Sequence, residues 1–349
     1  MESAGFAALR RVVASGRPCY LFGCGPAGQS WARTFAHLNF SGFLDNNPAL
    51  QGLTFAGLSV QSPLEVAKRH PDALVLLAST RRGTCKAMRR QCRELGFECR
   101  LFVEFWTSGI VGPAGPADVE ADVDLGHAYA LMADDLSRET YRGLARFWGT
   151  REIRETPRVF PNQYFVEVVP TRFYRSFADV GAYDGDTLRQ HIECLPLGFD
   201  NYYAIEPDPA NLSHFNPAPD TVDNLHMFAV AASDRSGTLS WSSAERSSQA
   251  AERGEGEVPC DRLDSILAGR PVTFIKMDLE GHELHALEGA RGIVAEQRPA
   301  LAICVYHRYE HLWRVPVWID SLVPGGYRFY LRHHLWGFME SVCYAVPVS

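Results

Sequence analysis

Apolar runs separated by helical patterns occupy the first hundred residues of the chain. We expect strands at 19–22, 42–44, 73–78 and 99–103, and helices at 6–13, 29–38 and 83–95. The run at 73–78 is apolar on both faces, as in a strand buried inside a parallel sheet. Strands that alternate with helices predict a small doubly wound α/β domain of the Rossmann type.

The second half of the chain repeats this alternation over a longer stretch. We expect strands at 177–180, 202–205, 225–231, 272–278 and 300–305, helices at 187–194 and 284–290, and an antiparallel pair at 327–331 and 342–346. The segments 237–241 and 258–262 indicate an inserted hairpin or a pair of edge strands. The polar stretch 242–257 between them has little apolar content, so we interpret it as a mobile loop. The pattern predicts a second doubly wound sheet that ends in antiparallel strands.

A cluster of glycine and proline at 109–116 interrupts the alternation, and a helical stretch at 128–148 follows it. We therefore predict three regions along the chain. Residues 1–106 form the Rossmann-like domain, residues 107–160 form a linker with the helical segment, and residues 161–349 form the second α/β domain.

Composition supports a folded protein with two cores. The 349 residues are 46% hydrophobic and 21% charged, which excludes a disordered or fibrous chain and exceeds what one core holds. The net charge of −7 gives no general attraction to nucleic acid or anionic membranes. We find no signal peptide and no run of about 18 apolar residues that would span a membrane. Together with nine cysteines in no regular framework, these features predict free thiols and a cytoplasmic location.

The first strand runs into a glycine-rich turn that matches the dinucleotide-binding fingerprint. Gly23 allows the tight turn, Gly25 lets the backbone approach a phosphate, and Gly28 lets helix and strand pack closely. Asp45, at the end of the next strand, could hold ribose hydroxyls. Two interpretations stay open, a nucleotide or nucleotide-sugar site and a purely structural module. The segment 19–80 resembles the small Rossmann-like domains attached to sugar-modifying enzymes.

A second glycine-rich turn follows the strand at 177–180. Gly181 and Gly185 bring the backbone close to a ligand because they carry no Cβ atom. Acidic side chains surround this turn, namely Asp179, Asp184 and Asp186. They would repel a phosphate and would suit a ligand with a cationic ammonium or sulfonium group, such as S-adenosylmethionine.

Further polar residues come directly after other predicted strands. Glu206 follows the strand at 202–205, in the position where a carboxylate binds a ribose diol, and Pro207 ends that strand. Other residues at strand ends are Asp234, Asp278, Glu280 and His307. The carboxyl ends of parallel strands meet at one edge of a sheet, so we expect these side chains to share one ligand site.

Three motifs in this half carry a family resemblance. They are Asp-Val-Gly-Ala-Tyr-Asp-Gly-Asp-Thr at 179–187, Ile-Glu-Pro-Asp-Pro at 205–209 and Ile-Lys-Met-Asp-Leu-Glu-Gly-His-Glu at 275–283. Their order and spacing resemble the FkbM-type methyltransferase family from about residue 160 to residue 346. The resemblance implies a class I methyltransferase fold, S-adenosylmethionine as methyl donor, and O-methylation of a hydroxyl on a sugar, glycan or polyketide-type acceptor. One departure is His311, where the family often has aspartate before Leu-Trp.

The resemblance also implies roles for individual residues. Those that would bind the cofactor are Asp179, Gly181, Ala182, Tyr183, Asp184, Gly185, Glu206, Pro207, Asp234 and Asp278. Asp278, Glu280 and His307 would form the acceptor side, with His307 the first candidate base because its ordinary pKa lies near neutrality. An alternative is that His307 is structural. Lys276 is expected to pair with a nearby carboxylate.

Two other classes of protein stay open. They are an NAD-dependent oxidoreductase that uses the first glycine loop and a non-catalytic nucleotide-sugar-binding module. We do not expect a zinc protease, since His282 and His285 lie three residues apart and the helical zinc motif needs four. No metal is assigned, although a divalent ion held by Asp278, Glu280 and His307 or His282 could assist deprotonation of the acceptor.

Overall fold

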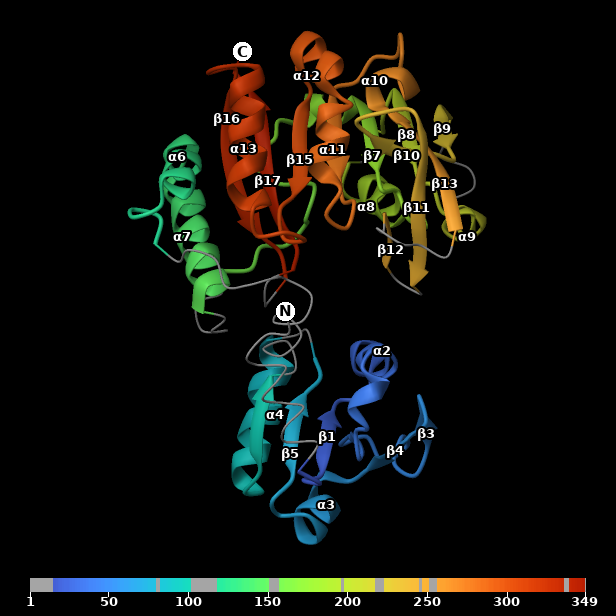
Figure 1. Cartoon of the computed structure of the whole chain (residues 1–349), viewed down its shortest axis with the longest axis vertical. Coiled ribbons are helices and arrows are strands. Elements are labelled where there is room, and N and C mark those ends of the chain that lie inside the picture. The colour runs from blue at the N-terminus through green and yellow to red at the C-terminus, as the bar shows by residue number, and fades with distance from the viewer. Residues whose placement is uncertain are drawn as a thin grey trace. The chain divides into compact units, whose positions relative to one another are not determined.

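The computed structural model describes residues 15–79, 82–101, 118–150, 157–195, 198–216, 223–244, 247–250, 256–335 and 339–348. The helix expected at 6–13 and the glycine and proline cluster at 109–116 lie outside these residues. The chain divides into two compact units, which Figure 1 shows. The first comprises Met1–Ala117, Arg146–Thr156 and Leu335–Phe338, and the second comprises Asp118–Ala145, Pro157–His334 and Met339–Ser349.

The first unit contains a sheet with the strand order β3-β4-β2-β1-β5-β6. Its strands are β1 (Cys19–Phe22), β2 (Gly42–Leu44), β3 (Thr54–Phe55), β4 (Leu58–Gln61), β5 (Leu74–Leu77) and β6 (Glu98–Leu101). Neighbouring strands pair in parallel, except that β3 pairs antiparallel with β4. Its helices are α2 (Pro26–Thr34), α3 (Pro63–Arg69) and α4 (Arg82–Glu94).

Both faces of this sheet are covered, as in a doubly wound domain. Side chains of a strand point alternately to opposite faces, so neighbouring residues of β1 enter different cores. Leu21 packs in one cluster with Trp31 of α2. Phe22 packs in the other cluster with Val66 of α3 and Cys92 of α4. The apolar character of these strands on both faces therefore follows from helices on either side.

Short elements of the first unit depart from the expected pattern. The helix expected at 29–38 begins at Pro26 and ends at Thr34, because proline fits the first turn of a helix, where its missing N–H would have no partner. A 3₁₀ turn, η1 (Ala36–Leu38), follows it. The sequence pattern does not predict β3, β4 or α3, because each is too short to show a clear period.

The second unit contains a seven-stranded sheet with the order β16-β17-β15-β14-β7-β8-β9. Its strands are β7 (Ser176–Val180), β8 (Asn201–Ile205), β9 (Leu225–Phe228), β14 (Phe274–Met277), β15 (Ala300–Cys304), β16 (Tyr327–His333) and β17 (Ser341–Pro347). The strands from β15 to β9 pair in parallel, and β17 pairs antiparallel with β15 and β16. This topology confirms the predicted doubly wound sheet with antiparallel strands at its end.

The helices of the second unit are α6 (Val123–Leu131), α7 (Asp135–Thr150, which belongs to this unit as far as Ala145), α8 (Asp186–Cys194), α9 (Pro209–Ser213), α10 (Leu263–Ile266), α11 (Glu283–Glu288), α12 (Arg291–Gln297) and α13 (His311–Leu322), with a 3₁₀ turn η3 (Thr171–Arg175). The helical stretch expected at 128–148 consists of the end of α6 and most of α7, with a short break between Leu131 and Asp135. Asp134 caps α7, since its carboxylate accepts a hydrogen bond of 2.7 Å from the Ser137 N–H. No helix within the described ranges combines the length and the hydropathy that a membrane span requires.

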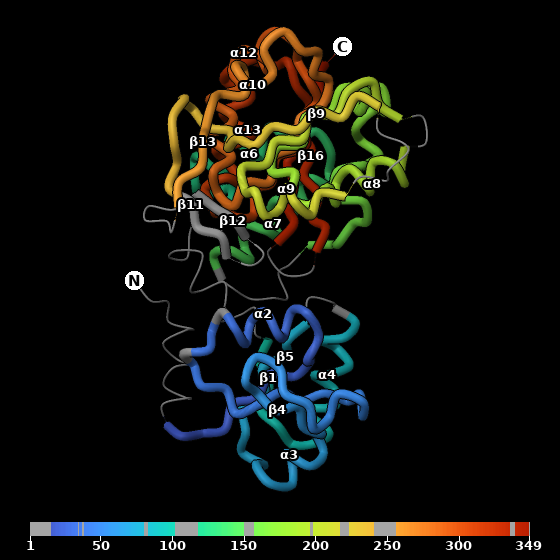
Figure 2. Tube along the Cα trace, turned by 90° about the vertical axis from the view of Figure 1, so that its right-hand side faces the viewer, coloured from blue at the N-terminus to red at the C-terminus, as the bar shows by residue number. Residues whose placement is uncertain are grey.

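A smaller sheet of the second unit has the order β10-β13-β11-β12. Its strands are β10 (Ala231–Ser233), β11 (Gly237–Ala244), β12 (Ser247–Ala250) and β13 (Gly256–Arg262). The extent of the strand expected at 225–231 is wrong, because β9 ends at Phe228 and β10 pairs with β13. The mobile loop expected at 242–257 is wrong in part, since β11 continues into it and pairs with β12. In Figure 2, β11 and β13 lie together on the flank of this unit opposite α8.

Aromatic rings surround a buried histidine in the core of the second unit. His191 of α8 has no exposed surface, and its ring centroid lies 5.3 Å from those of Phe165, Phe177 and Phe199. Neither ring nitrogen forms a hydrogen bond with a residue that the structure describes. Burial disfavours the charged ring and lowers the pKa of His191 from its ordinary value of 6.5 to about 4. The ring is therefore neutral in the folded protein at neutral pH.

Replacement of His191 by leucine should make the second unit less sensitive to acid. The unfolded chain takes up a proton on His191 near pH 6.5, whereas the folded chain resists protonation down to about pH 4. The native histidine therefore lowers the free energy of unfolding as the pH falls below 6.5, by about 2 kcal/mol at pH 5. In urea unfolding, we expect the difference in free energy of unfolding between His191→Leu and wild type to shift in favour of the variant by this amount from pH 7.5 to pH 5. A difference that stays constant over this range would contradict a neutral buried ring.

Candidate active site

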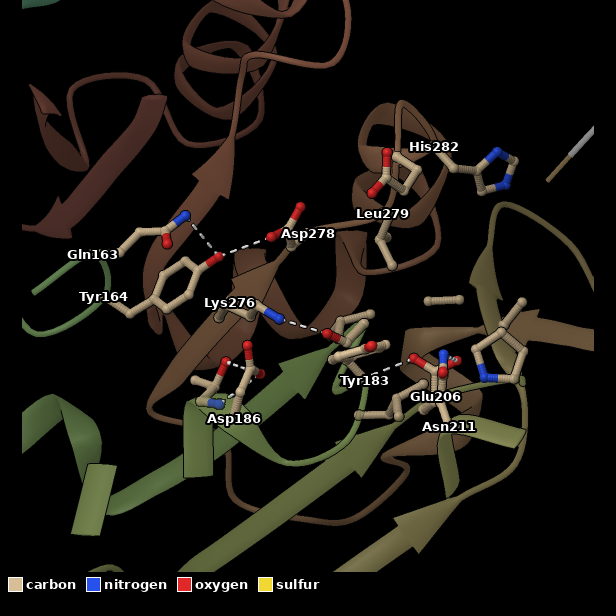
Figure 3. A pocket seen from close by; sticks show the side chains of 18 of the residues that line it. Gln163, Tyr164, Tyr183, Asp186, Glu206, Asn211, Lys276, Asp278, Leu279 and His282 are labelled. Carbon is tan, nitrogen blue, oxygen red and sulfur yellow. Dashed lines mark hydrogen bonds between the residues drawn. The ribbon is translucent and has the colours of Figure 1, made fainter. Parts of the chain in front are cut away.

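A cavity of about 280 Å³ opens at the carboxyl ends of β7, β8 and β14 in the second unit. Figure 3 shows Tyr164 and Asp278 on one wall and Glu206 and Asn211 on the opposite wall. Gly181, Glu206 and Asp278 line the cavity, and they directly follow the last residues of β7, β8 and β14. The structure thus brings three residues that the sequence singles out to one edge of the sheet, where ligands of such sheets bind.

A buried ion pair supports the turn after β7. Asp179 has no exposed surface, accepts a hydrogen bond of 2.6 Å from the Tyr202 hydroxyl, and lies 2.9 Å from Lys276 Nζ. Lys276 Nζ also donates to the Gly181 carbonyl at 2.5 Å. Although burial disfavours the charged ammonium, the Asp179 carboxylate holds the pKa of Lys276 above its ordinary value. Lys276 therefore has the carboxylate partner that the sequence leads us to expect. Asp179 affects the turn through Lys276, which contacts both the carboxylate and the Gly181 carbonyl.

The turn after β7 requires glycine at two positions. Gly181 has a φ of +82°, and a Cβ atom there would lie 2.1 Å from the Asp278 carbonyl oxygen. Gly185 has a φ of +86°, and its Cβ atom would lie 3.1 Å from the ring of Phe215. The N–H groups of Gly181 and Ala182 donate to the Ile205 carbonyl at 2.9 and 3.1 Å, which ties the turn to β8. Two stretches of backbone thus meet without a side chain between them.

Glu206 is held in one orientation at the end of β8. Its Oε2 accepts a hydrogen bond of 3.0 Å from the Tyr183 N–H, and its Oε1 accepts bonds of 2.9 Å from the Asp208 N–H and 3.1 Å from the Asn211 amide. Burial raises the pKa of Glu206. A carboxylate offers about four acceptor positions, so one remains for a ligand in the cavity. Pro207 lines the cavity beside it.

Apolar side chains form another part of the lining. They come from the segment where the chain passes from β9 to β10 and from β11, and they are Val230, Ala231, Ala232 and Leu239. The departure of β10 from the main sheet, which the sequence pattern does not predict, therefore shapes the cavity. A slot with apolar walls beside a fixed carboxylate suits a flat ring joined to a ribose.

Carboxylates dominate the remaining part of the cavity. Asp278 accepts hydrogen bonds from the Tyr164 hydroxyl at 3.0 Å and from the Tyr306 hydroxyl at 3.1 Å. Glu280 and Glu340 also line the cavity, and each has a positive φ, of 51° and 61°. Burial raises the pKa of Glu280 to about 7, and burial together with the charge of Asp278 raises that of Glu340 to about 7. This region suits hydroxyl groups and cations, and it would repel an anion.

His307 lies behind this group of carboxylates and does not line the cavity. Its Nδ1 is 2.6 Å from Glu283 Oε1, and its Nε2 is 3.4 Å from Asp278 Oδ1 and 3.5 Å from Glu280 Oε2. Although burial disfavours the charged ring, the Glu283 carboxylate and its neighbours raise the pKa of His307 to about 10. With no metal bound, a ring protonated at neutral pH has no free lone pair, so this geometry does not favour His307 as the base.

Several residues predicted to bind the cofactor lie outside the lining, namely Asp179, Ala182, Asp184, Gly185 and Asp234. Asp184 pairs with Arg189 at 2.7 Å. Asp234 lies 3.2 Å from His285 Nδ1 and lines a second cavity, of about 620 Å³. The roles of these residues as cofactor ligands stay predictions.

The sequence pattern does not single out four lining residues, Gln163, Tyr164, Asn211 and Glu340. The first two precede η3 in an irregular segment, and Glu340 lies just before β17. Irregular segments carry no hydrophobic period, so no local signal marks their side chains. Contacts reveal them instead, since Tyr164 binds Asp278 and Gln163 donates to the Glu340 carboxylate.

Asp45 and the first glycine loop contact each other within the first unit. Asp45 accepts hydrogen bonds of 2.9 Å from the N–H groups of Cys24 and Asn47. A Cβ atom at Gly28 would lie 2.0 Å from the Gly23 carbonyl oxygen, so these residues pack in direct contact. The contacts give the glycines and the acid a structural purpose. Nucleotide binding through Gly23, Gly25, Gly28 and Asp45 stays a prediction.

One solved structure is similar in fold over nearly the full length of the chain. The crystal structure of Methyltransferase FkbM from Methylobacillus flagellatus KT is 23% identical, with a TM-score of 0.72, over 98% of this chain and 95% of that chain. The protein thus has the α/β fold of a methyltransferase. The sequence model of the methyltransferase FkbM domain matches residues 179–340. Residues 179–340 therefore match the methyltransferase FkbM domain, which confirms the resemblance drawn from the motifs in this region.

Two further solved structures show partial similarity. Fibrillarin from Aeropyrum pernix, solved with natively bound S-adenosyl-L-methionine, matches at 13% identity and a TM-score of 0.32, over 52% of this chain and 70% of its own. UDP-D-quinovosamine 4-dehydrogenase from Vibrio fischeri matches at 19% identity and a TM-score of 0.21, over 26% of this chain and 84% of its own. No curated protein sequence matches the chain.

A comparison of two glycines tests the close backbone contact in the site. Gly181 and Gly198 have similar φ values, +82° and +67°, but no described atom lies within 4 Å of a Cβ at Gly198. Gly198→Ala should cost only backbone strain, about 1–2 kcal/mol. Gly181→Ala should cost at least about 2 kcal/mol more, because the Cβ atom would collide with the Asp278 carbonyl. Equal losses of the free energy of unfolding in the two variants would show that this contact is not as described.

Proposed function

We propose that the protein transfers a methyl group from S-adenosylmethionine to a hydroxyl oxygen of a small-molecule or glycan acceptor. The observation that carries this proposal is the pairing of Gly181 and Glu206 on one cavity. Gly181 lies at the end of β7, and the oriented carboxylate of Glu206 lies at the end of the neighbouring strand β8. This arrangement offers a stretch of backbone beside one part of a nucleoside ligand and a free acceptor position on a carboxylate for its ribose.

The lining residues fit such a cofactor along its length. Glu206 would bind a ribose hydroxyl, and the apolar slot of Val230, Ala231 and Leu239 would hold the adenine ring. The turn at Gly181 lines the cavity and would lie beside the methionine part, where nearby carboxylates favour its cationic groups. When bound, S-adenosylmethionine supplies a methyl group on a sulfonium, which is a good leaving group.

The residues of the chain would then contribute mainly position and charge. Asp278, Glu280 and Glu340 present oxygens that can accept hydrogen bonds from acceptor hydroxyls. Tyr164 and Tyr306 fix the orientation of Asp278 through their own hydroxyls. Such positioning lowers the activation barrier of methyl transfer, because the reactants have already lost translational and rotational entropy on binding. The acidic lining supports a neutral polyhydroxylated acceptor and disfavours a phosphorylated one, in agreement with the sugar or polyketide hydroxyl implied by the family resemblance.

Calorimetric titration with S-adenosylmethionine and S-adenosylhomocysteine tests the cofactor assignment. We expect wild type to bind each at one site per chain, with a Kd on the order of micromolar. Glu206→Ala should weaken binding by about 100-fold, because the ribose loses a hydrogen bond to a charged group. Glu193→Ala, at an exposed position of α8, is the matched control and should bind as wild type does.

The same assay separates the competing functions. Binding of NAD or a UDP-sugar in place of S-adenosylmethionine would overturn the proposal and direct attention to the glycine loop at Gly23. Normal binding of S-adenosylmethionine by Glu206→Ala would keep the activity but contradict this placement of the cofactor. In each case, circular dichroism of the variant establishes that it is folded.

A further inference from the structure

We propose that Asp278, Glu280 and His307 bind a divalent cation at the acidic end of the cavity. The sequence alone assigns no metal, and the inference comes from how the fold places one imidazole nitrogen among carboxylates. The cation site stands on its own contacts, whereas its use in methyl transfer rests on the function proposed above.

The orientation of His307 is fixed by a carboxylate on its far side. Glu283, the first residue of α11, has no exposed surface, and its Oε1 is 2.6 Å from His307 Nδ1. The same oxygen accepts a hydrogen bond of 2.9 Å from the Leu279 N–H, so the carboxylate itself cannot turn freely. A carboxylate that receives the Nδ1 proton sets the ring so that Nε2 points away from it. This is the arrangement in which proteins present a histidine to a metal.

Nε2 of His307 meets two carboxylates without forming a hydrogen bond. It lies 3.4 Å from Asp278 Oδ1 and 3.5 Å from Glu280 Oε2, and it has no hydrogen-bond partner among the described residues. The side chain of His307 is only 7% exposed, so water does not readily supply the missing partner. Two ligands that bind one ion at about 2.1 Å, with an angle of 90–110° between them, lie about 3.0–3.4 Å apart. The observed spacings are close to this range.

One group that contains His307 is compact enough for a metal centre, and Glu280 is not part of that group. Asp278, Glu283 and His307 each offer one ligand atom, and these atoms lie within 4.8 Å of one another. Glu283 already accepts hydrogen bonds from Leu279 and His307, so we assign it the orienting role and Asp278 the role of ligand. Each Asp278 oxygen accepts only one tyrosine hydroxyl and retains a lone pair for an ion.

The donor set indicates which ion fits. Two carboxylates and one imidazole combine hard oxygen ligands with a nitrogen ligand, which suits Mn²⁺ and leaves Mg²⁺ as a weaker alternative. Asp278 and Glu280 line the cavity whereas His307 lies behind them, so a bound ion would sit in the cavity wall with open positions facing inward. Those positions would take oxygens of the acceptor. The ion would thereby orient the hydroxyl that is to be methylated and stabilise negative charge on its oxygen.

Titration of the chelator-treated, full-length protein with Mn²⁺ tests the site directly. The free-ion signal in electron paramagnetic resonance should fall as one Mn²⁺ binds per chain. His307→Asn and Glu280→Gln should each weaken binding at least about tenfold, since each removes a ligand. His285→Asn is the matched control, because this exposed histidine lies 3.2 Å from Asp234 on the second cavity, and it should leave binding unchanged.

Three results would overturn the proposal. They are no loss of the free-ion signal with wild type, wild-type affinity in both ligand variants, and equal weakening in His285→Asn. Should His307→Asn fail to fold, Glu280→Gln decides, because Glu280 lies in a half-buried loop position. A parallel titration of the metal-free protein with S-adenosylmethionine keeps the two proposals separate, since the cofactor can bind where Mn²⁺ does not.

Discussion

The buried ion pair between Asp179 and Lys276 is the interaction on which the geometry of the site depends. It joins β7 to β14, and the Tyr202 hydroxyl reaches the same carboxylate from β8, so three neighbouring strands meet at one charged group. Lys276 transmits this constraint to the Gly181 carbonyl and so fixes the turn. Loss of one partner of such a pair leaves an uncompensated buried charge, at a cost of about 3–5 kcal/mol. Asp179 therefore constrains the backbone of the turn through Lys276.

The fixed turn separates two chemically different parts of one cavity. On one side, Glu206 and the apolar residues near β10 offer oriented acceptors and a slot for a flat ring. On the other, Asp278 and Glu280 collect negative charge around the Nε2 of His307. The close backbone contact at Gly181 lets both parts face the same small volume. A methyl donor with a cationic group and an acceptor hydroxyl, if both bind here, would lose little further translational and rotational entropy when they react.

The sequence predicts the parts of the molecule that follow a regular period. The sequence predicts the parallel strands, the turn at Gly181 and the carboxylates after β8 and β14, because each strand is a short apolar run with a polar residue at its end. The split between β9 and β10 is not readable, since nothing local shows which sheet a strand joins. The same holds for Tyr164 and Glu340, which come from irregular segments. The sequence also suggests His307 as a base from its ordinary pKa, whereas three surrounding carboxylates change its charge state.

A crystal structure of the protein with S-adenosylhomocysteine tests the central claim most directly. We predict ligand density at the carboxyl ends of β7, β8 and β14, with a ribose hydroxyl on the Glu206 carboxylate and the adenine ring against Ala231 and Leu239. The sulfur should face Asp278. Density at the Gly23 turn of the first unit, or a ligand in the main cavity with its ribose away from Glu206, would contradict the assignment of this cavity as the methyl-transfer site.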